Sequence, residues 1–376
     1  MVLPEPTPWL PSEPETTVAL SPWDLRMITV EYTQTGVLLP KPPTTGGHHA
    51  HVVERLTSSF ARALGRFYPY AGRLAVAPGG EGGSISVSLR CSMEGAEFVH
   101  AVAPGVTVAD VVAPLYTPVV VRSFFPLDGL LGVDAVVGSR PVLAAQVTEL
   151  ADGVFVAMSL NHAVGNGTAF WHFFNTWSEI SRRHTDDAAI SSPLPVHRRW
   201  FLDGCRVPIP LPFSKLEDIV SYGHPSSVQP QDCFLHFSAD SVKKLKAKAN
   251  AEASGTGSTT ISSLQALLAH LWVAVCRARR LAPDQSTTYV LLEREFFRPW
   301  FGRTFAPRSR MYHPFTCGSV SLLNSIFFIK GLFGWRLMAP HLFSRTWGTP
   351  RSVALKMRPQ CGGKSTAKDN ARLWQA

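Results

Sequence analysis

The sequence lacks the features that mark membrane-spanning and secreted proteins. No apolar run among its 376 residues reaches the roughly 18 residues that a membrane-crossing helix requires. The proline-rich start has neither the basic nor the apolar region of a secretory signal. Cysteine is scarce, since the six cysteines are scattered and no two form a CxxC pair, which favours free thiols over a disulfide framework or a zinc site. We therefore expect a cytoplasmic protein that is not associated with a membrane.

Two widespread catalytic signatures are absent as well. The GxSxG turn that exposes the nucleophile of serine hydrolases does not occur. The run Gly363–Ser365 is not a phosphate-binding loop, because Arg358 stands where that motif requires its first glycine. His48, His49 and His51 could suggest a metal, but no cysteine or carboxylate lies at ligand spacing from them. A surface loop ahead of a helix is the better interpretation, and we predict no metal site.

The net charge of +9 comes from one end of the chain. Residues 293–376 contain 14 of the 36 Lys and Arg residues but only 3 of the 27 Asp and Glu residues, which makes this segment +11. Its basic residues are interspersed with apolar stretches and match no known nucleic-acid-binding module. We therefore predict a nearly neutral protein with a basic tail and no nucleic-acid partner.

The stretch 153–180 carries the clearest structural signal. Val154–Leu160 is an apolar, β-branched run that is typical of a strand buried on both faces. Asn161, His162 and a short loop follow it, and Thr168 is suited to cap the next helix. Apolar residues recur along that helix at helical spacing: Phe170, Phe173, Phe174, Trp177 and Ile180. The pattern therefore predicts a strand, a loop and a helix that ends near residue 181.

This arrangement places an imidazole at the C-terminal end of a strand, just before the N-terminus of a helix. The positive end of a helix disfavours the imidazolium, so His162 is expected to be neutral and able to accept a proton at pH 7. On spacing alone, a loop histidine with a structural hydrogen bond is the other interpretation. Segments elsewhere in the chain bear on the choice between the two.

Residues before this stretch also show periodicity. The apolar spacing predicts a helix over about 50–66, and glycine and proline predict a hairpin turned at 78–83. Further strands are expected at Met27–Tyr32 and in a hairpin formed by residues 140–150 and 153–160, and short strands are expected to alternate with connections over residues 97–113 and 116–122.

Residues 182–232 lose this periodicity and are rich in proline, as in a long connection between two lobes. A strand at about 233–238 and two helices are expected to follow, the second capped by Thr260 or Ser262. The first helix has a lysine-rich face, which is either a solvated surface or a surface that attracts phosphates. The second helix is expected to point five side chains inward: Leu264, Leu267, Leu268, Leu271 and Val275. A last strand is expected at Thr287–Leu292.

Several motifs together resemble the plant BAHD acyltransferases, which use acyl-CoA. The histidine loop resembles their HxxxD motif. Further similar segments are LSPWDL (20–25), FARALGRFYPYAGRL (60–74), SFFPLDG (123–129), PVLAAQVTEL (141–150) and the regions 235–253 and 260–281. The resemblance extends from about residue 16 to about residue 292, and it rests on the whole set of segments because HxxxD alone is a weak signal.

The resemblance implies an α/β fold of two lobes with mixed sheets, similar to chloramphenicol acetyltransferase, with an incomplete second lobe. It divides the chain into an N-terminal lobe (1–181), a crossover linker (182–232), the start of a C-terminal lobe (233–292) and a divergent basic tail (293–376). It implies that His162 is the general base that deprotonates an alcohol or amine acceptor for attack on acyl-CoA, in a channel between the lobes. Acyl-CoA is then a co-substrate, no cofactor stays bound, and we expect a monomer.

Two features depart from the family pattern. Asn166, next to Gly167, stands where the motif has aspartate, and the family aspartate pairs with an arginine that holds the loop in shape. Losing that charge is expected to cost about 1 kcal/mol. After Leu292 the family's DFGWG segment is absent, and Leu332–Arg336 matches it only in part. These departures leave a second hypothesis open, a non-catalytic relative that arises from a frame or splice change and binds at most a ligand or partner.

Overall fold

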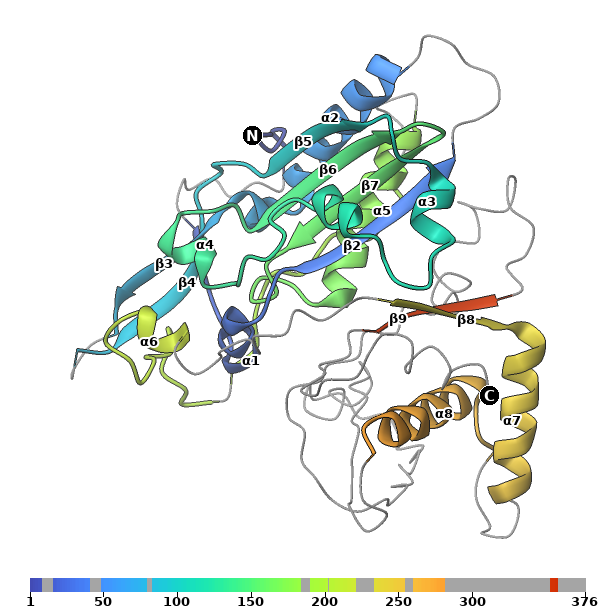
Figure 1. The fold of residues 1–376 in the computed structure, drawn as a ribbon. Helices are drawn as coiled ribbons and strands as arrows, with labels where there is room; N and C mark the ends of the chain where they lie inside the picture. Colours follow the sequence, from blue (N-terminus) through green and yellow to red (C-terminus); the bar gives the residue numbers. More distant parts are fainter. Residues whose placement is uncertain are drawn as a thin grey trace. The chain divides into compact units, whose positions relative to one another are not determined.

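The computed structural model describes residues 1–8, 16–40, 49–79, 83–183, 190–201, 203–220, 233–253, 260–280 and 352–357. The chain divides into two compact units, Met1–Pro225 and Ser226–Ala376, and each is described by itself (Figure 1). The strand expected at Thr287–Leu292, the segment Leu332–Arg336 and His48 lie outside the described residues. None of the helices in the described ranges combines the length and apolar content that a membrane span requires.

The first unit is built around a four-stranded mixed sheet with the strand order β2-β7-β6-β5 (Figure 1). Its strands are β2 (Thr33–Pro40), β5 (Glu97–Ala103), β6 (Leu143–Leu150) and β7 (Gly153–Leu160). β5 and β6 are parallel, and the other neighbours are antiparallel. The hairpin predicted across Asp152-Gly153 is confirmed as β6–β7. The strand predicted at Met27–Tyr32 is wrong, because Met27–Thr29 forms a 3-10 turn and the strand begins only at Thr33.

β7 is buried on both faces, as its apolar run predicts. Val156, Met158 and Leu160 belong to the main core of the unit, while Phe155 and Ala157 belong to a second cluster. This alternation follows from the two-residue period of a strand. The second cluster is completed by residues from α3 (Val108–Val112) and from the 3-10 helix η4 (Val119–Phe124). The short strands predicted over 97–113 and 116–122 are confirmed only for β5, because α3 and η4 are helical.

Two long helices carry the main core, α2 (His49–Arg66) and α5 (Gly167–Arg182). Both agree with the helices that apolar spacing predicts. The Phe60 ring on α2 meets the rings of Phe173 and Trp177 on α5 edge to face, at centroid distances of 5.6 and 5.1 Å. The indole N–H of Trp177 donates to the Leu56 carbonyl at 3.0 Å. Because α5 is fixed in this way, the loop that precedes it is fixed at its C-terminal end.

A smaller antiparallel sheet adjoins this core, with the order β1-β4-β3. Its strands are β1 (Thr16–Ala19), β3 (Arg73–Pro78) and β4 (Ile85–Cys91), and the predicted hairpin is confirmed as β3–β4. Short helical segments connect the strands: α1 (Pro22–Arg26), η2 (Tyr68–Ala71), α4 (Asp134–Val137) and α6 (Glu217–Val220). In α1, Ser21 and Asp24 form a reciprocal capping box.

The second unit contains β8 (Cys233–Ser238), paired antiparallel with β9 (Ser352–Met357), and the helices α7 (Ala239–Ala253) and α8 (Ser263–Ala278). Ser262 caps α8 with a capping box, as its position predicts. A buried cluster joins the three elements β8, α7 and α8: Leu235, Val242, Leu267 and Leu271. Leu264 is predicted to face inward but is 40% exposed, although it shares a face with Leu267 and Leu271, because it lies in the first turn of α8, where the helix begins.

Candidate active site

The loop between β7 and α5 carries the predicted catalytic residue, His162, and it starts from a buried asparagine. Asn161 has no exposed surface. Its backbone N–H donates to the Val142 carbonyl at 2.7 Å, and its side-chain amide donates to the Gly132 carbonyl at 3.0 Å. Its side-chain oxygen accepts from the N–H of Ala163 at 3.0 Å. Sequence analysis gave Asn161 no role, although an amide side chain directly after a fully apolar strand was a signal.

Asn166 closes the other end of the loop as the N-cap of α5. Its side-chain oxygen accepts from the backbone N–H of Ala169 at 3.0 Å, and Gly167 is the first residue of the helix. The cap predicted at Thr168 is therefore wrong by two residues. Asn166 therefore has a structural role without an ionic partner: it accepts a hydrogen bond from a helix N–H that would otherwise be unsatisfied.

Substitutions at Asn166 are expected to separate capping from charge. Asn166→Ala removes the acceptor and should lower the free energy of unfolding by about 1 kcal/mol. Asn166→Asp keeps the acceptor and adds a negative charge at the positive end of α5, so it should be neutral or stabilising by up to about 1 kcal/mol. Urea unfolding at pH 7 measures both. A loss in the aspartate variant equal to that in the alanine variant would contradict the capping role.

His162 is half-buried, and its surroundings favour the neutral ring. Burial lowers the pKa of His162 below its usual 6.5, and a hydrogen bond with its own backbone and the negative charge of Asp24 oppose that change in part. The direction agrees with the neutral imidazole predicted from the sequence. Burial is the leading cause of the lowered pKa, whereas the sequence predicts a neutral ring from the positive end of the following helix.

Arg199 contacts this loop and is itself paired with Asp24, and both residues come from distant parts of the chain. One carboxylate oxygen of Asp24 accepts from the backbone N–H of Ser21 at 2.9 Å and from Arg199 Nε at 3.0 Å. Arg199 Nη2 donates to the backbone carbonyl of Val164, in the middle of the loop, at 2.6 Å. No sequence pattern assigns either residue to this loop, because Asp24 stands within LSPWDL and Arg199 lies in the proline-rich stretch without periodicity.

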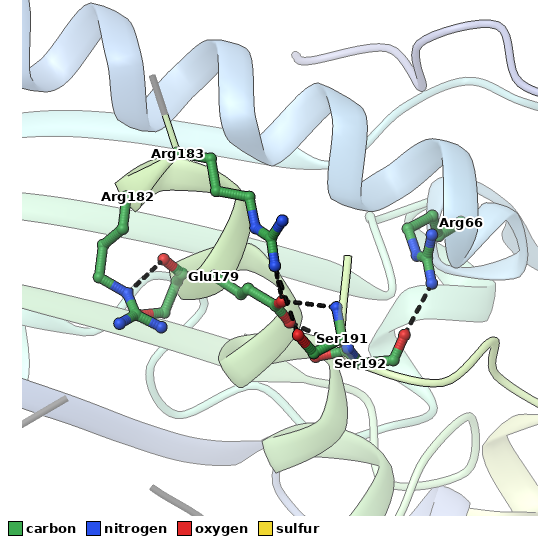
Figure 2. A network of polar contacts seen from close by, with 7 residues as sticks. Arg66, Glu179, Arg182, Arg183, Ser191 and Ser192 are labelled. Atoms are coloured by element: carbon green, nitrogen blue, oxygen red, sulfur yellow. Dashed lines mark hydrogen bonds and ion pairs between the residues drawn. The ribbon is translucent and has the colours of Figure 1, made fainter. Parts of the chain in front are cut away.

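Residues 190–201, here called the crossover segment, are hydrogen-bonded to α2 and α5 at several points. Glu179 on α5 accepts from the backbone N–H groups of Ser191 and Ser192 at 2.6 and 3.0 Å. Arg66 on α2 donates to the Ser192 carbonyl at 2.9 Å, and Figure 2 shows these groups converging on the start of the segment. His172 Nε2 and the Pro193 carbonyl are 2.9 Å apart. The segment therefore brings Arg199 to the loop along a fixed path.

Glu179→Gln tests this anchor. Burial alone would raise the pKa of Glu179, but hydrogen bonds from Ser192, Ser191 and Arg183 outweigh it and lower the pKa to about 2. Because the pKa of Glu179 is lower in the folded state, its ionised carboxylate stabilises the fold at pH values above its usual pKa of 4.5. This stabilisation is lost as the pH falls toward 2. The glutamine variant should lose about 1–3 kcal/mol at pH 7 and progressively less below pH 4.5.

The control for this prediction is Glu252→Gln on α7, whose side chain is 70% exposed and pairs with Lys248 only at 4.0 Å. It should change stability by less than about 0.5 kcal/mol at any pH. Urea unfolding at pH 7, 4.5 and 3 makes the comparison. A constant difference between wild type and Glu179→Gln across this range would contradict the assignment.

A small cavity of about 70 Å³ lies beside the loop. Its lining includes Val164 and Ala169 at the start of α5, together with Tyr70, His197 and Arg199. Burial lowers the pKa of His197 to about 4. Nε2 of His197 is buried and has no hydrogen-bond partner among the described residues. Residues of the loop and of the crossover segment therefore border one small space, although Ala163 and Val164 themselves belong to the main core.

His162 lies in the loop between β7 and α5, Asn166 is the N-cap of α5, and Gly167 is the first residue of that helix. Within the described parts of the chain, no group of three or more His, Cys, Asp or Glu side chains could hold a metal ion. The channel that the resemblance implies between the lobes stays a prediction, as do the residues that would hold the acyl donor.

Comparisons with known proteins address the family directly. The family model described as the transferase family matches residues 7–293. An uncharacterized acetyltransferase of Arabidopsis thaliana is 37% identical over 272 residues, which are 72% of this chain and 59% of that protein. The BAHD acyltransferase DCR of the same plant is 33% identical over 246 residues, 64% of this chain and 49% of its own length. The chain belongs to the BAHD acyltransferase family.

Solved structures support the fold of a BAHD acyltransferase. TRI101 of F. graminearum, in complex with coenzyme A and deoxynivalenol, matches with a TM-score of 0.54 at 16% identity, over 72% of this chain and 63% of that one. TRI101 of F. sporotrichioides, in complex with coenzyme A and T-2, matches with a TM-score of 0.51. The predicted α/β fold with mixed sheets is confirmed. The chain spans about three-fifths of the length of two of the curated relatives that it matches.

Proposed function

We propose that this chain is an acyl-CoA-dependent O- or N-acyltransferase in which His162 is the general base. The single observation that carries the proposal is the His162 loop itself. A half-buried imidazole with a lowered pKa follows a buried strand in a chain that belongs to the BAHD family. Such a ring is mostly neutral at pH 7 and can accept a proton from a substrate hydroxyl or amine.

The reaction needs no covalent enzyme intermediate. His162 takes the proton from the acceptor O–H or N–H while the oxygen or nitrogen attacks the thioester carbonyl. The tetrahedral intermediate then collapses, the C–S bond breaks, and the CoA thiolate leaves and receives the proton from the imidazolium. General-base assistance contributes typically about 10²–10⁴-fold. Holding both substrates in one place contributes more, because it converts a bimolecular step into a unimolecular one.

The chemistry of named relatives suggests substrates to test. An oat relative is named as a hydroxycinnamoyl-CoA:5-hydroxyanthranilate N-hydroxycinnamoyltransferase, and a barley relative as an agmatine coumaroyltransferase. Both names describe acyl transfer to an amine. We therefore propose a small-molecule alcohol or amine as the acceptor and either acetyl-CoA or an aromatic acyl-CoA as the donor.

The test is release of free CoA by the purified chain. Acetyl-CoA and a hydroxycinnamoyl-CoA are each incubated with a panel of phenols, alcohols and amines, and the new thiol is titrated with a chromogenic disulfide. Acceptor-dependent release that requires His162 is the expected result. The family match does not favour the non-catalytic alternative. Folded protein that releases no CoA with any donor and acceptor of the panel would contradict the proposal and support that alternative instead.

A further inference from the structure

The His162 loop is held by hydrogen bonds at three points. At the middle point the donor is an arginine that is paired with an aspartate from another part of the chain. Asn161 anchors the start of the loop and Asn166 caps its end. Between them, the Val164 carbonyl accepts from Arg199 Nη2 at 2.6 Å. Val164 is 2% exposed, so bulk water has little access to its carbonyl in place of this donor. Removing it would leave a buried carbonyl without a partner, which is costly.

Asp24 orients the guanidinium that makes this bond. Arg199 Nε lies 3.0 Å from a carboxylate oxygen of Asp24, and the two side chains are 23% and 20% exposed. Limited exposure weakens screening by salt and water, so this pair is stronger than a typical surface pair. The same carboxylate accepts the backbone N–H of Ser21 in the capping box of α1, which holds it in place.

The cavity beside the loop explains why such a contact is needed. Val164 and Arg199 both line this space of about 70 Å³. On the side that borders this space, the loop has fewer packing contacts than buried backbone normally has, so a polar contact contributes more to its position. A planar guanidinium can bridge two acceptors at a fixed spacing, whereas a lysine ammonium is a point charge on a flexible stem. Arg199 spans this region with one donor on Asp24 and another on Val164.

We propose that Arg199, oriented by Asp24, is the positioning residue that fixes the His162 loop. Its importance for turnover rests on the proposed function, while its effect on the loop does not. Arg199 also offsets the negative charge of Asp24, which is the charged group that acts on His162. Three separate parts of the chain, the α1 cap, the crossover segment and the loop, therefore cooperate to place one imidazole.

The matched variants are Arg199→Gln, Arg199→Lys and Arg198→Gln. Arg198 is the neighbouring residue on the same segment and is exposed, so its substitution controls for loss of one positive charge. Hydrogen exchange reads the loop directly, because the N–H groups of Val164 and Gly165 donate to the Asn161 carbonyl at 3.0 and 3.3 Å. Arg199→Gln should speed their exchange about tenfold or more, Arg199→Lys less, and Arg198→Gln not at all.

Two kinetic readouts apply if the chain releases CoA. Arg199→Gln should lower kcat about tenfold or more with a small change in KM, because a displaced base affects the transition state more than binding. It should also move the acid limb of the pH profile upward, since Asp24 is then no longer offset and favours the protonated ring. Arg199→Lys, which keeps the charge, should restore the pH profile more than it restores kcat.

The outcomes separate this inference from the proposed function. Exchange of the loop amides at the same rate in Arg199→Gln and Arg198→Gln would overturn the positioning role, whether or not the wild type is active. If the loop amides exchange faster in Arg199→Gln but the wild type releases no CoA, the positioning role is upheld and the proposed function is contradicted. Faster exchange throughout the first unit would show general destabilisation and would also overturn a local role for Arg199.

Discussion

Replacing His162 by alanine is expected to lower kcat for acyl transfer by about 10²–10⁴-fold, the range that general-base assistance supplies. The reason is that no proton acceptor then stands where the acceptor hydroxyl or amine must lose its proton. The residual rate should be the part of catalysis that comes from holding both substrates together. KM for acyl-CoA should change little, because the base acts on the acceptor. Release of CoA is measured at saturating acceptor across the pH range.

The pH dependence gives this prediction a second test. The pKa of His162 is lowered from its usual 6.5, so the acid limb of kcat/KM for the wild type should lie below pH 6.5. That limb should vanish in His162→Ala. The control is His100→Ala on β5, whose ring is 2.9 Å from Glu149 and remote from the His162 loop in sequence. An alanine variant at 162 that keeps both the rate and the acid limb would remove His162 from the mechanism.

Replacing Trp177 by alanine is expected to lower the free energy of unfolding of the first unit by about 3–5 kcal/mol, the usual cost of deleting a buried aromatic ring. Trp177 is 2% exposed and contacts the rings of Phe60, Phe98 and Phe174. Its indole N–H also serves the Leu56 carbonyl, so the substitution leaves a cavity and an acceptor with one bond fewer. α2 and α5 are both loosened by this change, and with them the loop that precedes α5.

Calorimetry or fluorescence-monitored unfolding measures this effect. In a unit of this size, each kcal/mol of lost stability lowers Tm by about 2–4 °C, so we expect Tm to fall by about 6–20 °C. Trp177→Phe keeps most of the ring but loses the N–H donor, so it should cost less. Trp23→Ala is the matched control, because Trp23 is 55% exposed and its loss opens no cavity. Equal changes in Tm at positions 23 and 177 would show that Trp177 does not hold the core.

Sequence reasoning succeeded where local periodicity is strong. The alternating and fully apolar runs identified β6 and β7, and helical spacing identified α2 and α5, because burial imposes periods of 2 and 3.6 residues on the chain. It failed where two local structures compete over a few residues. Met27–Thr29 has strand-like composition but forms a 3-10 turn. Thr168 and Asn166 are both good caps, and contacts outside the helix decide which one is used.

The sequence by itself determined the family, the elements β6, β7, α2 and α5, and the place of His162 between a buried strand and a helix. Only the tertiary structure decided what holds that histidine. Asp24 and Arg199 are 175 residues apart in the chain, and Arg199 and Val164 are 35 apart. No local pattern encodes such a contact, because it exists only once the crossover segment has folded back over α2 and α5. The physical reason is that ion pairs and carbonyl bonds depend on distance in space, whereas periodicity records only neighbours along the chain.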